Sequence, residues 1–170
     1  MDFQPIVNVV LVAPEIPQNT GNLIRLCANV GARLHLVEPL GFKLENPGLR
    51  RASLDYSDLT HIQVHHFIDE LLKDVPIGRV YGATNHGTVL YTTPRYRQGD
   101  TIVFGSESIG LPDHVVDKVN VGNRLRIPMM PANRSLNLSN AVAIILYEMW
   151  RQIGFSSESP PLCENQKYFS

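Results

Sequence analysis

Residues 6–13, Ile-Val-Asn-Val-Val-Leu-Val-Ala, form an almost unbroken run of apolar and mostly β-branched side chains. A run of this kind is typical of a strand covered on both faces, because a half-exposed strand alternates apolar with polar residues. Strands covered on both faces occur mainly in parallel sheets that carry helices on each side. The start of the chain therefore predicts an α/β fold built on a parallel sheet.

Further apolar runs alternate with helical patterns, which is the order expected of strand–helix–strand units. The spacing predicts strands at residues 33–37, 79–84, 101–106 and 125–128, and helices at residues 23–30, 67–75 and 138–153. Residues 14–22 are rich in proline, asparagine and glycine and are predicted to form a turn. Because no repeat or second apolar core is visible, we expect a single domain over residues 1–154 and a loose tail over residues 155–170.

Composition argues against several classes of protein. The 170 residues are 44% hydrophobic and carry a net charge of −1, which is unlike a disordered chain. No apolar run approaches the roughly 20 residues of a membrane span, and the first residues lack the basic start of a signal peptide, so we expect a cytoplasmic protein without membrane association. Cys27 and Cys163 are too few for a disulfide framework, and the histidines are scattered, so no metal site is expected.

Charge neither demands nor excludes a nucleic-acid partner. Fifteen basic and sixteen acidic residues give no bulk attraction to phosphate, yet only four of the basic residues are lysines and the remainder are arginines. The planar guanidinium of arginine suits local recognition of phosphate or carboxylate. The glycine-rich and Walker-type fingerprints of nucleotide-binding proteins are absent from the sequence.

The first of three polar motifs is Pro-Glu-Ile-Pro-Gln-Asn-Thr-Gly-Asn at residues 14–22, which leads into the first helix. On that helix Asn22, Arg25 and Asn29 form a polar stripe opposite the apolar one. Amides beside one guanidinium suit a ribose and its phosphate. An ordinary solvated helix face is the alternative, and the pattern alone does not separate the two.

The other two motifs follow buried strands, where open α/β sheets bind ligands. Residues 104–112 contain two glycines, which allow the backbone to approach a ligand or simply form a turn. Residues 127–140 form a polar loop that enters a very apolar helix, and Asn137 or Ser139 could cap it. Capping does not account for the other polar residues of this loop, and backbone N–H groups at the helix start could instead receive a carboxylate.

The three motifs together resemble, in order and spacing, the signatures of the SpoU-type SPOUT RNA methyltransferases. The supporting segments are residues 14–22, Leu-Arg-Arg-Ala-Ser-Leu-Asp-Tyr at residues 49–56, residues 104–112, and Arg-Ser-Leu-Asn-Leu-Ser-Asn at residues 134–140. The resemblance extends over residues 6–154 and is strongest to the small tRNA (cytidine/uridine-34)-2′-O-methyltransferases of the TrmL, or YibK-like, subfamily, which lack an appended RNA-binding domain.

The resemblance implies a parallel sheet flanked by helices with a C-terminal trefoil knot. It implies methylation of the ribose 2′-hydroxyl of the wobble nucleotide of tRNA, specifically of leucine tRNA, with S-adenosyl-L-methionine as methyl donor. It also implies a homodimer formed through the first and last helices, so that Arg25 of one subunit faces the cofactor of the other.

The resemblance further assigns residues to roles by matching position. Cofactor contacts are implied for Ala83, Thr84, Gly105, Glu107, Ile127, Met129, Ser135 and Leu136. Catalytic roles are implied for Arg25, Glu107, Ser135 and Asn140, and RNA contacts for Asn22, Lys43, Arg50, Arg51 and Arg134. Because a free guanidinium is a poor base, we interpret Arg25 as orienting the ribose and its phosphate, with Glu107 as the alternative proton acceptor. Ala83 and Ser106 depart from the family pattern, which has a leucine and frequently a proline at these positions.

Three other hypotheses remain open at this point. The chain could methylate ribosomal RNA or another tRNA position, or it could be a catalytically silent RNA-binding or ribosome-assembly factor on the same fold. The intact motifs, including Arg25, count against a silent factor. A flavodoxin-like ligand binder is disfavoured by the missing phosphate loop.

Overall fold

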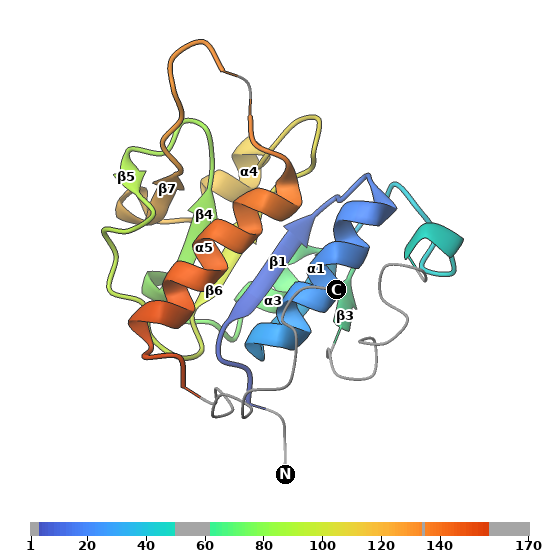
Figure 1. Ribbon diagram of the computed structural model, residues 1–170, viewed down its shortest axis with the longest axis horizontal. Coiled ribbons are helices and arrows are strands. Elements are labelled where there is room, and N and C mark those ends of the chain that lie inside the picture. Colours follow the sequence, from blue (N-terminus) through green and yellow to red (C-terminus); the bar gives the residue numbers. More distant parts are fainter. Residues whose placement is uncertain (1–3, 50–61, 134, 157–170) are drawn as a thin grey trace, which may run out of the picture.

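Seven parallel strands form a single sheet in the order β3-β2-β1-β6-β4-β7-β5 (Figure 1). The computed structural model describes residues 4–49, 62–133 and 135–156. The strands are β1 Asn8–Val12, β2 Arg33–Val37, β3 Ile62–His65, β4 Val80–Ala83, β5 Val89–Leu90, β6 Thr101–Phe104 and β7 Arg124–Arg126. Every pairing between neighbouring strands is parallel, which confirms the predicted sheet.

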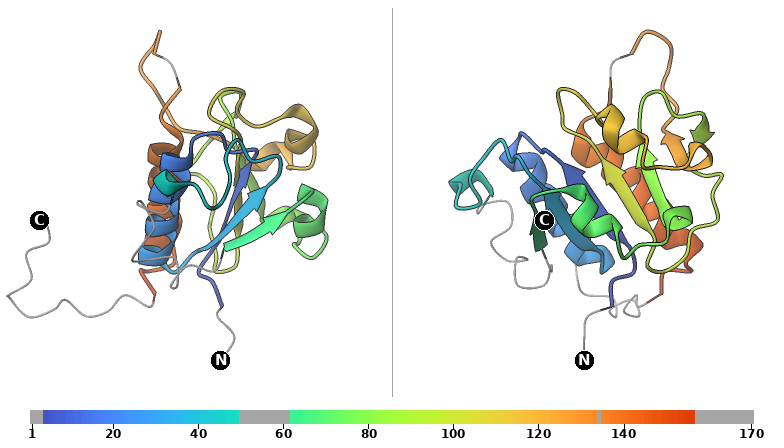
Figure 2. Two further views of the ribbon diagram at one scale, coloured as in Figure 1. Left: turned by 90° about the vertical axis from the view of Figure 1, so that its right-hand side faces the viewer. Right: turned by 180° about the vertical axis from the view of Figure 1, so that it is seen from behind.

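Helices cover both faces of the sheet. The helices are α1 Pro17–Val30, α3 Ile68–Leu72, α4 Asp113–Val116 and α5 Leu138–Gln152, with 3₁₀ turns at Ile77–Arg79 and Val121–Asn123. The two long helices α1 and α5 lie side by side on one face, and α3 and α4 lie on the other (Figure 2). Among the described residues, no helix is long and apolar enough to cross a membrane.

The central strand β1 explains the unbroken apolar run at the start of the chain. Its residues point alternately to the two faces of the sheet, so Val9 and Leu11 pack in the core beneath α1 and α5. Val10 and Val12 pack in the second core, against α3 and α4. Since both faces are buried, a polar residue would be costly at any of these four positions.

Helix α1 begins at Pro17, six residues before the start predicted from the apolar stripe. Proline suits the first helical position because its fixed φ is helical and its missing N–H would have no partner there. The polar residues that follow, Asn19 and Thr20, are buried within the first turn, together with Gly21. The prediction of a turn over residues 14–22 was therefore wrong after Ile16, because burial outweighs local turn preference here.

The other predicted elements are confirmed to within two residues, except that α3 ends at Leu72, three residues before the predicted end of that helix, and the missed elements are short. Strand β3 is an edge strand with no run of apolar residues, and β5 has only two residues. Neither carries enough periodic signal to be recognised from sequence.

A chain of polar side chains links three neighbouring strands. On β2, the buried His35 places its Nδ1 3.0 Å from Nε2 of His65 on β3 and its Nε2 3.2 Å from Oδ1 of Asn8 on β1. Burial, and then the positive charges of His65 and Arg33, lower the pKa of His35 to about 3. His35 is therefore neutral in the folded protein at ordinary pH.

We expect the free energy of unfolding to fall as the pH drops from 7 to 5. In the unfolded chain His35 titrates near pH 6.5, so between about pH 6.5 and 3 the unfolded state binds the extra proton and is favoured. Between pH 7 and pH 5 this single group contributes a loss of about 2 kcal/mol. Urea denaturation of wild type and of His35→Gln at pH 7 and at pH 5 measures this change in the free energy of unfolding.

The variant His114→Gln serves as the control, because His114 is an exposed histidine on α4. His114→Gln should keep the full pH dependence, whereas His35→Gln should be flatter. Equal pH dependence in wild type and His35→Gln would contradict the assignment.

Candidate functional site

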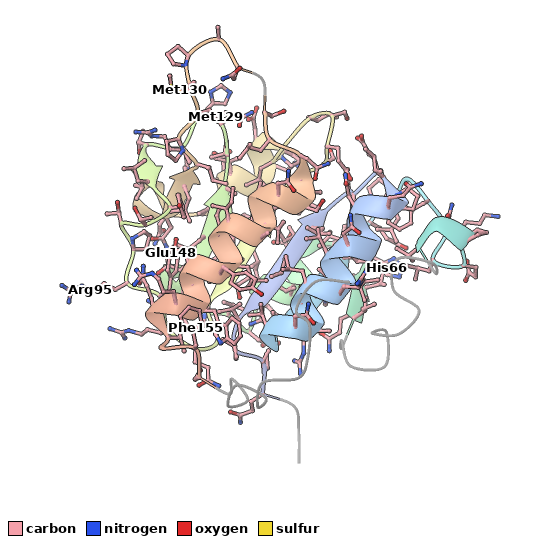
Figure 3. The ribbon with its side chains drawn as sticks, in the orientation of Figure 1. His66, Arg95, Met129, Met130, Glu148 and Phe155 are labelled. Atoms are coloured by element: carbon pink, nitrogen blue, oxygen red, sulfur yellow. The ribbon has the colours of Figure 1, made fainter. Side chains whose placement is uncertain are left out.

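A cavity of about 590 Å³ opens at the carboxyl ends of β4, β6 and β7. Carboxyl ends of parallel strands meet at one edge of a sheet, so the segments that follow them are brought together there. The start of α1 and the loop between β7 and α5 complete the cavity wall. Figure 3 shows Met129 and Met130 on this loop, which extends beyond the edge of the sheet.

Every residue that the resemblance assigns to the cofactor lines this cavity. These residues are Ala83, Thr84, Gly105, Glu107, Ile127, Met129, Ser135 and Leu136. They come from three segments far apart in the sequence, and the parallel sheet collects them at one place. Their role in binding a cofactor stays a prediction.

The glycines of the second motif shape the loop after β6. A Cβ on Gly105 would lie 1.8 Å from the carbonyl carbon of Gly110, so no larger residue fits there. Ser106 and Gly110 exchange two backbone hydrogen bonds of 3.2 and 2.9 Å, and Gly110 has a left-handed φ of 77°. The loop therefore folds back on itself, and Gly105 allows close contact between two backbone segments.

The carboxylate of Glu107 binds the start of α1. It accepts hydrogen bonds from the backbone N–H of Glu15 at 2.8 Å, from that of Ile16 at 3.1 Å, and from Nδ2 of Asn19 at 3.1 Å. Ile16 is the N-cap residue and has no capping side chain of its own. A negative charge at this position also interacts favourably with the helix dipole. Through these hydrogen bonds, Glu107 links the second motif to the first.

Asn19 extends this network to the third motif. Its Oδ1 accepts a hydrogen bond of 3.1 Å from Nδ2 of Asn137. The side-chain oxygen of Asn137 in turn accepts from the backbone N–H groups of Ser139 at 2.9 Å and Asn140 at 3.4 Å. The prediction that Asn137 caps α5 is confirmed, and these two N–H groups are not left for the carboxylate of a ligand.

Two of the predicted catalytic residues line the cavity and two do not. Glu107 and Ser135 belong to the wall, whereas Asn140 is exposed in the first turn of α5. Arg25 lies on the exposed face of α1 together with Asn22, as the predicted polar stripe requires.

The two predicted RNA contacts that the structure describes, Asn22 and Lys43, do not line the cavity. Asn22 is on α1, and Lys43 lines a separate, more open hollow of about 730 Å³ after β2 and β3. Arg50, Arg51 and Arg134 lie outside the described residues.

Sequence reasoning missed several residues of the wall. Asn85, His86, Arg126 and Asn133 also line the cavity. Arg126 could have been noticed, since it directly precedes the third motif in a predicted strand. The bridging role of Asn19 had no signal in the sequence, because it depends on partners roughly 90 and 120 positions away.

The chemistry available in this cavity is that of binding and orientation. Glu107, the one carboxylate among the described residues of the wall, already accepts three hydrogen bonds. The thiol of Cys27 lies in the core, where burial raises its pKa to about 12 and keeps it protonated. Within the part of the chain that the structure describes, no group of three or more histidine, cysteine and acidic side chains is placed to hold a metal ion.

We expect Asn19→Ala to lower the free energy of unfolding by about 1–3 kcal/mol, because one hydrogen bond to a charged group and one to an amide are lost at a buried position. Urea denaturation measures the change. The matched control Asn29→Ala removes an exposed amide from the same helix and should stay within about 0.5 kcal/mol of wild type. Similar values for the two variants would show that the network does not stabilise the fold.

Comparison with known proteins agrees with this geometry. A tRNA (cytidine(34)-2′-O)-methyltransferase of Methylovorus glucosotrophus (strain SIP3-4) is 49% identical to this chain over 149 residues, which cover 88% of this chain and 97% of that protein. A solved structure that addresses the 2-OH methylation of C/U34 on tRNA superposes with a TM-score of 0.81 at 41% identity, over 88% of this chain and 97% of the other.

A second solved structure, an AdoMet-bound rRNA methyltransferase from Sinorhizobium meliloti, has a TM-score of 0.77 and 25% identity over 86% of this chain and 56% of that one. The model of the SpoU rRNA methylase family matches residues 6–147, from β1 into α5, and so includes all three motifs and the cavity. The resemblance carried by the motifs is thereby confirmed, and this chain belongs to the SpoU rRNA methylase family.

Proposed function

We propose that this chain methylates the ribose 2′-hydroxyl of the wobble nucleotide, C34 or U34, of tRNA. The observation that carries the proposal is that the three motifs meet around one cavity in a chain nearly half identical to a tRNA (cytidine(34)-2′-O)-methyltransferase. The alignment covers 88% of this chain and 97% of that protein, which supports a shared substrate.

We propose S-adenosylmethionine as the methyl donor. The cavity has the size of a small-molecule site, which ranges over roughly 300–1,000 Å³, and its wall offers both apolar and polar side chains. Ile127, Met129 and Leu136 supply apolar surface, and Thr84 and Ser135 supply hydroxyl groups. When bound, this donor supplies an electrophilic methyl group, so the protein has only to hold it and to align the accepting hydroxyl.

Arg25 and Asn140 are proposed to orient the substrate ribose, and Ser135 is proposed to donate a hydrogen bond inside the cavity. For Glu107 the three N–H donors on its carboxylate favour a positioning role over that of proton acceptor, because accepting a proton would weaken these hydrogen bonds. Asn22, Lys43, Arg50, Arg51 and Arg134 remain the proposed contacts to RNA.

We further infer that two copies pair through α1 and α5. Arg25 does not line the cavity of its own chain, so a second copy is needed to bring this guanidinium to the reaction. On α5, Ile144 and Tyr147 are 36% and 44% exposed although they are apolar or aromatic, and such surface is typical of an interface. A C-terminal trefoil knot and a cytoplasmic location are part of the same proposal.

The proposal is tested by transfer of radiolabelled methyl from S-adenosylmethionine to tRNA and ribosomal RNA that lack the modification. We expect label on the ribose of the wobble nucleotide of a leucine tRNA, located by mass spectrometry. Label on ribosomal RNA instead would favour the second candidate, which the likeness to an rRNA methyltransferase supports. If neither RNA is labelled although the donor binds, the proposed function is wrong.

Arg25→Ala should abolish methyl transfer while leaving the affinity for S-adenosylmethionine unchanged, because Arg25 does not line the cavity. Isothermal titration calorimetry and single-turnover assays measure the two quantities. Arg95→Ala, which removes an exposed arginine that does not line the cavity, is the control and should retain activity. Loss of donor binding in Arg25→Ala would instead make Arg25 part of the donor site.

A further inference from the structure

Arg126 is the last residue of β7 and lies at the mouth of the cavity, where it is exposed to solvent. It is the one arginine or lysine among the described residues that line the cavity. Of the wall residues that the structure describes, Glu107 alone is acidic, and its carboxylate is bound to the start of α1. Among the described residues of the wall, Arg126 is therefore an arginine with no acidic partner.

The surrounding arginines show how the fold uses this residue type elsewhere. Arg79 pairs with the buried Asp100. Arg124, on the same strand as Arg126, donates a hydrogen bond of 3.1 Å to the carbonyl of Val119. In the described ranges the side chain of Arg126 makes no hydrogen bond or ion pair. Its guanidinium therefore does not stabilise the fold through polar contacts of the kind that Arg79 and Arg124 make.

Exposed apolar side chains lie in the same wall as this charge. Ile109, from the loop after β6, is 81% exposed, and Met130, from the loop after β7, is 76% exposed. Figure 3 shows Met130 far out on its loop. Apolar side chains that remain this exposed at a cavity mouth are typical of a surface that contacts a large ligand. A nucleotide matches both features, because its base offers an apolar face and its phosphate a negative charge.

We propose that Arg126 binds a backbone phosphate of the substrate RNA beside the target nucleotide and so positions the ribose over the cavity. This inference rests on the proposed function. A guanidinium can hold two phosphate oxygens at once, which fixes orientation as well as distance. The carboxylate of the methyl donor is the other available anion. The exposure of Arg126 beside Ile109 and Met130 favours RNA, which approaches from solvent.

The test compares Arg126→Gln and Arg126→Lys with the control Arg95→Gln. Arg95 is also an exposed arginine, but it lies on the molecule far from Met129 and Met130 (Figure 3) and does not line the cavity. Filter binding with unmodified leucine tRNA is measured over a range of salt concentrations, and calorimetry measures the affinity for S-adenosylmethionine. Thermal melting verifies that each variant is folded.

We expect Arg126→Gln to weaken tRNA binding about tenfold and to reduce the salt slope by about 0.7. The KM for tRNA should rise, and the affinity for S-adenosylmethionine should stay unchanged. Arg126→Lys should keep the salt slope, since the charge remains, and recover only part of the affinity. Arg95→Gln should match wild type in every measurement.

Two results would overturn the inference while leaving the proposed function intact. In the first, wild type methylates tRNA and Arg126→Gln shows the same salt slope and KM as Arg95→Gln. In the second, Arg126→Gln loses affinity for S-adenosylmethionine alone, which would assign the guanidinium to the methyl donor. If wild type neither binds nor methylates tRNA, the proposed function fails and this inference fails with it.

Discussion

The hydrogen bonds of the Glu107 carboxylate to the start of α1 are the interaction on which the site depends. Through them, and through the contact of Asn19 with Asn137, the loop after β6 and the first turns of α1 and α5 are held in one arrangement. Each of these segments alone is a surface loop or a helix end with unsatisfied N–H groups. Joined, they satisfy several of these groups and form part of the cavity wall.

Side chains with the same chemistry are used in two ways in this protein. Arg79 and Arg124 stabilise the fold, with Asp100 and the Val119 carbonyl as partners. Arg126 has no such partner among the described residues and faces the cavity mouth. The asparagines of α1 also differ in their surroundings. Asn19 is buried in the hydrogen-bond network, whereas Asn22, one turn later, is exposed. Only the surroundings of each side chain separate a structural role from a binding role.

Local patterns predicted much of the sheet and the wall of the site. The apolar run of β1 and the cap of α5 by Asn137 were predictable from local patterns, and the residues that the family resemblance assigned to a cofactor line the cavity. The start of α1 was not, because residues 14–22 have the composition of a turn and become helical only where burial and Glu107 support them. Strands β3 and β5 were missed because they are too short or too exposed to show a period.

The sequence by itself determined the α/β class, the parallel sheet and the family, because apolar periodicity and motif order are local properties of the chain. Only the tertiary structure decided which polar residues meet. Glu107 reaches α1 across roughly 90 positions of sequence, and Arg25 does not line the cavity of its own chain. Hydrogen bonds and ion pairs act over a few ångströms in space, so their partners become known only when the strands are ordered in the sheet.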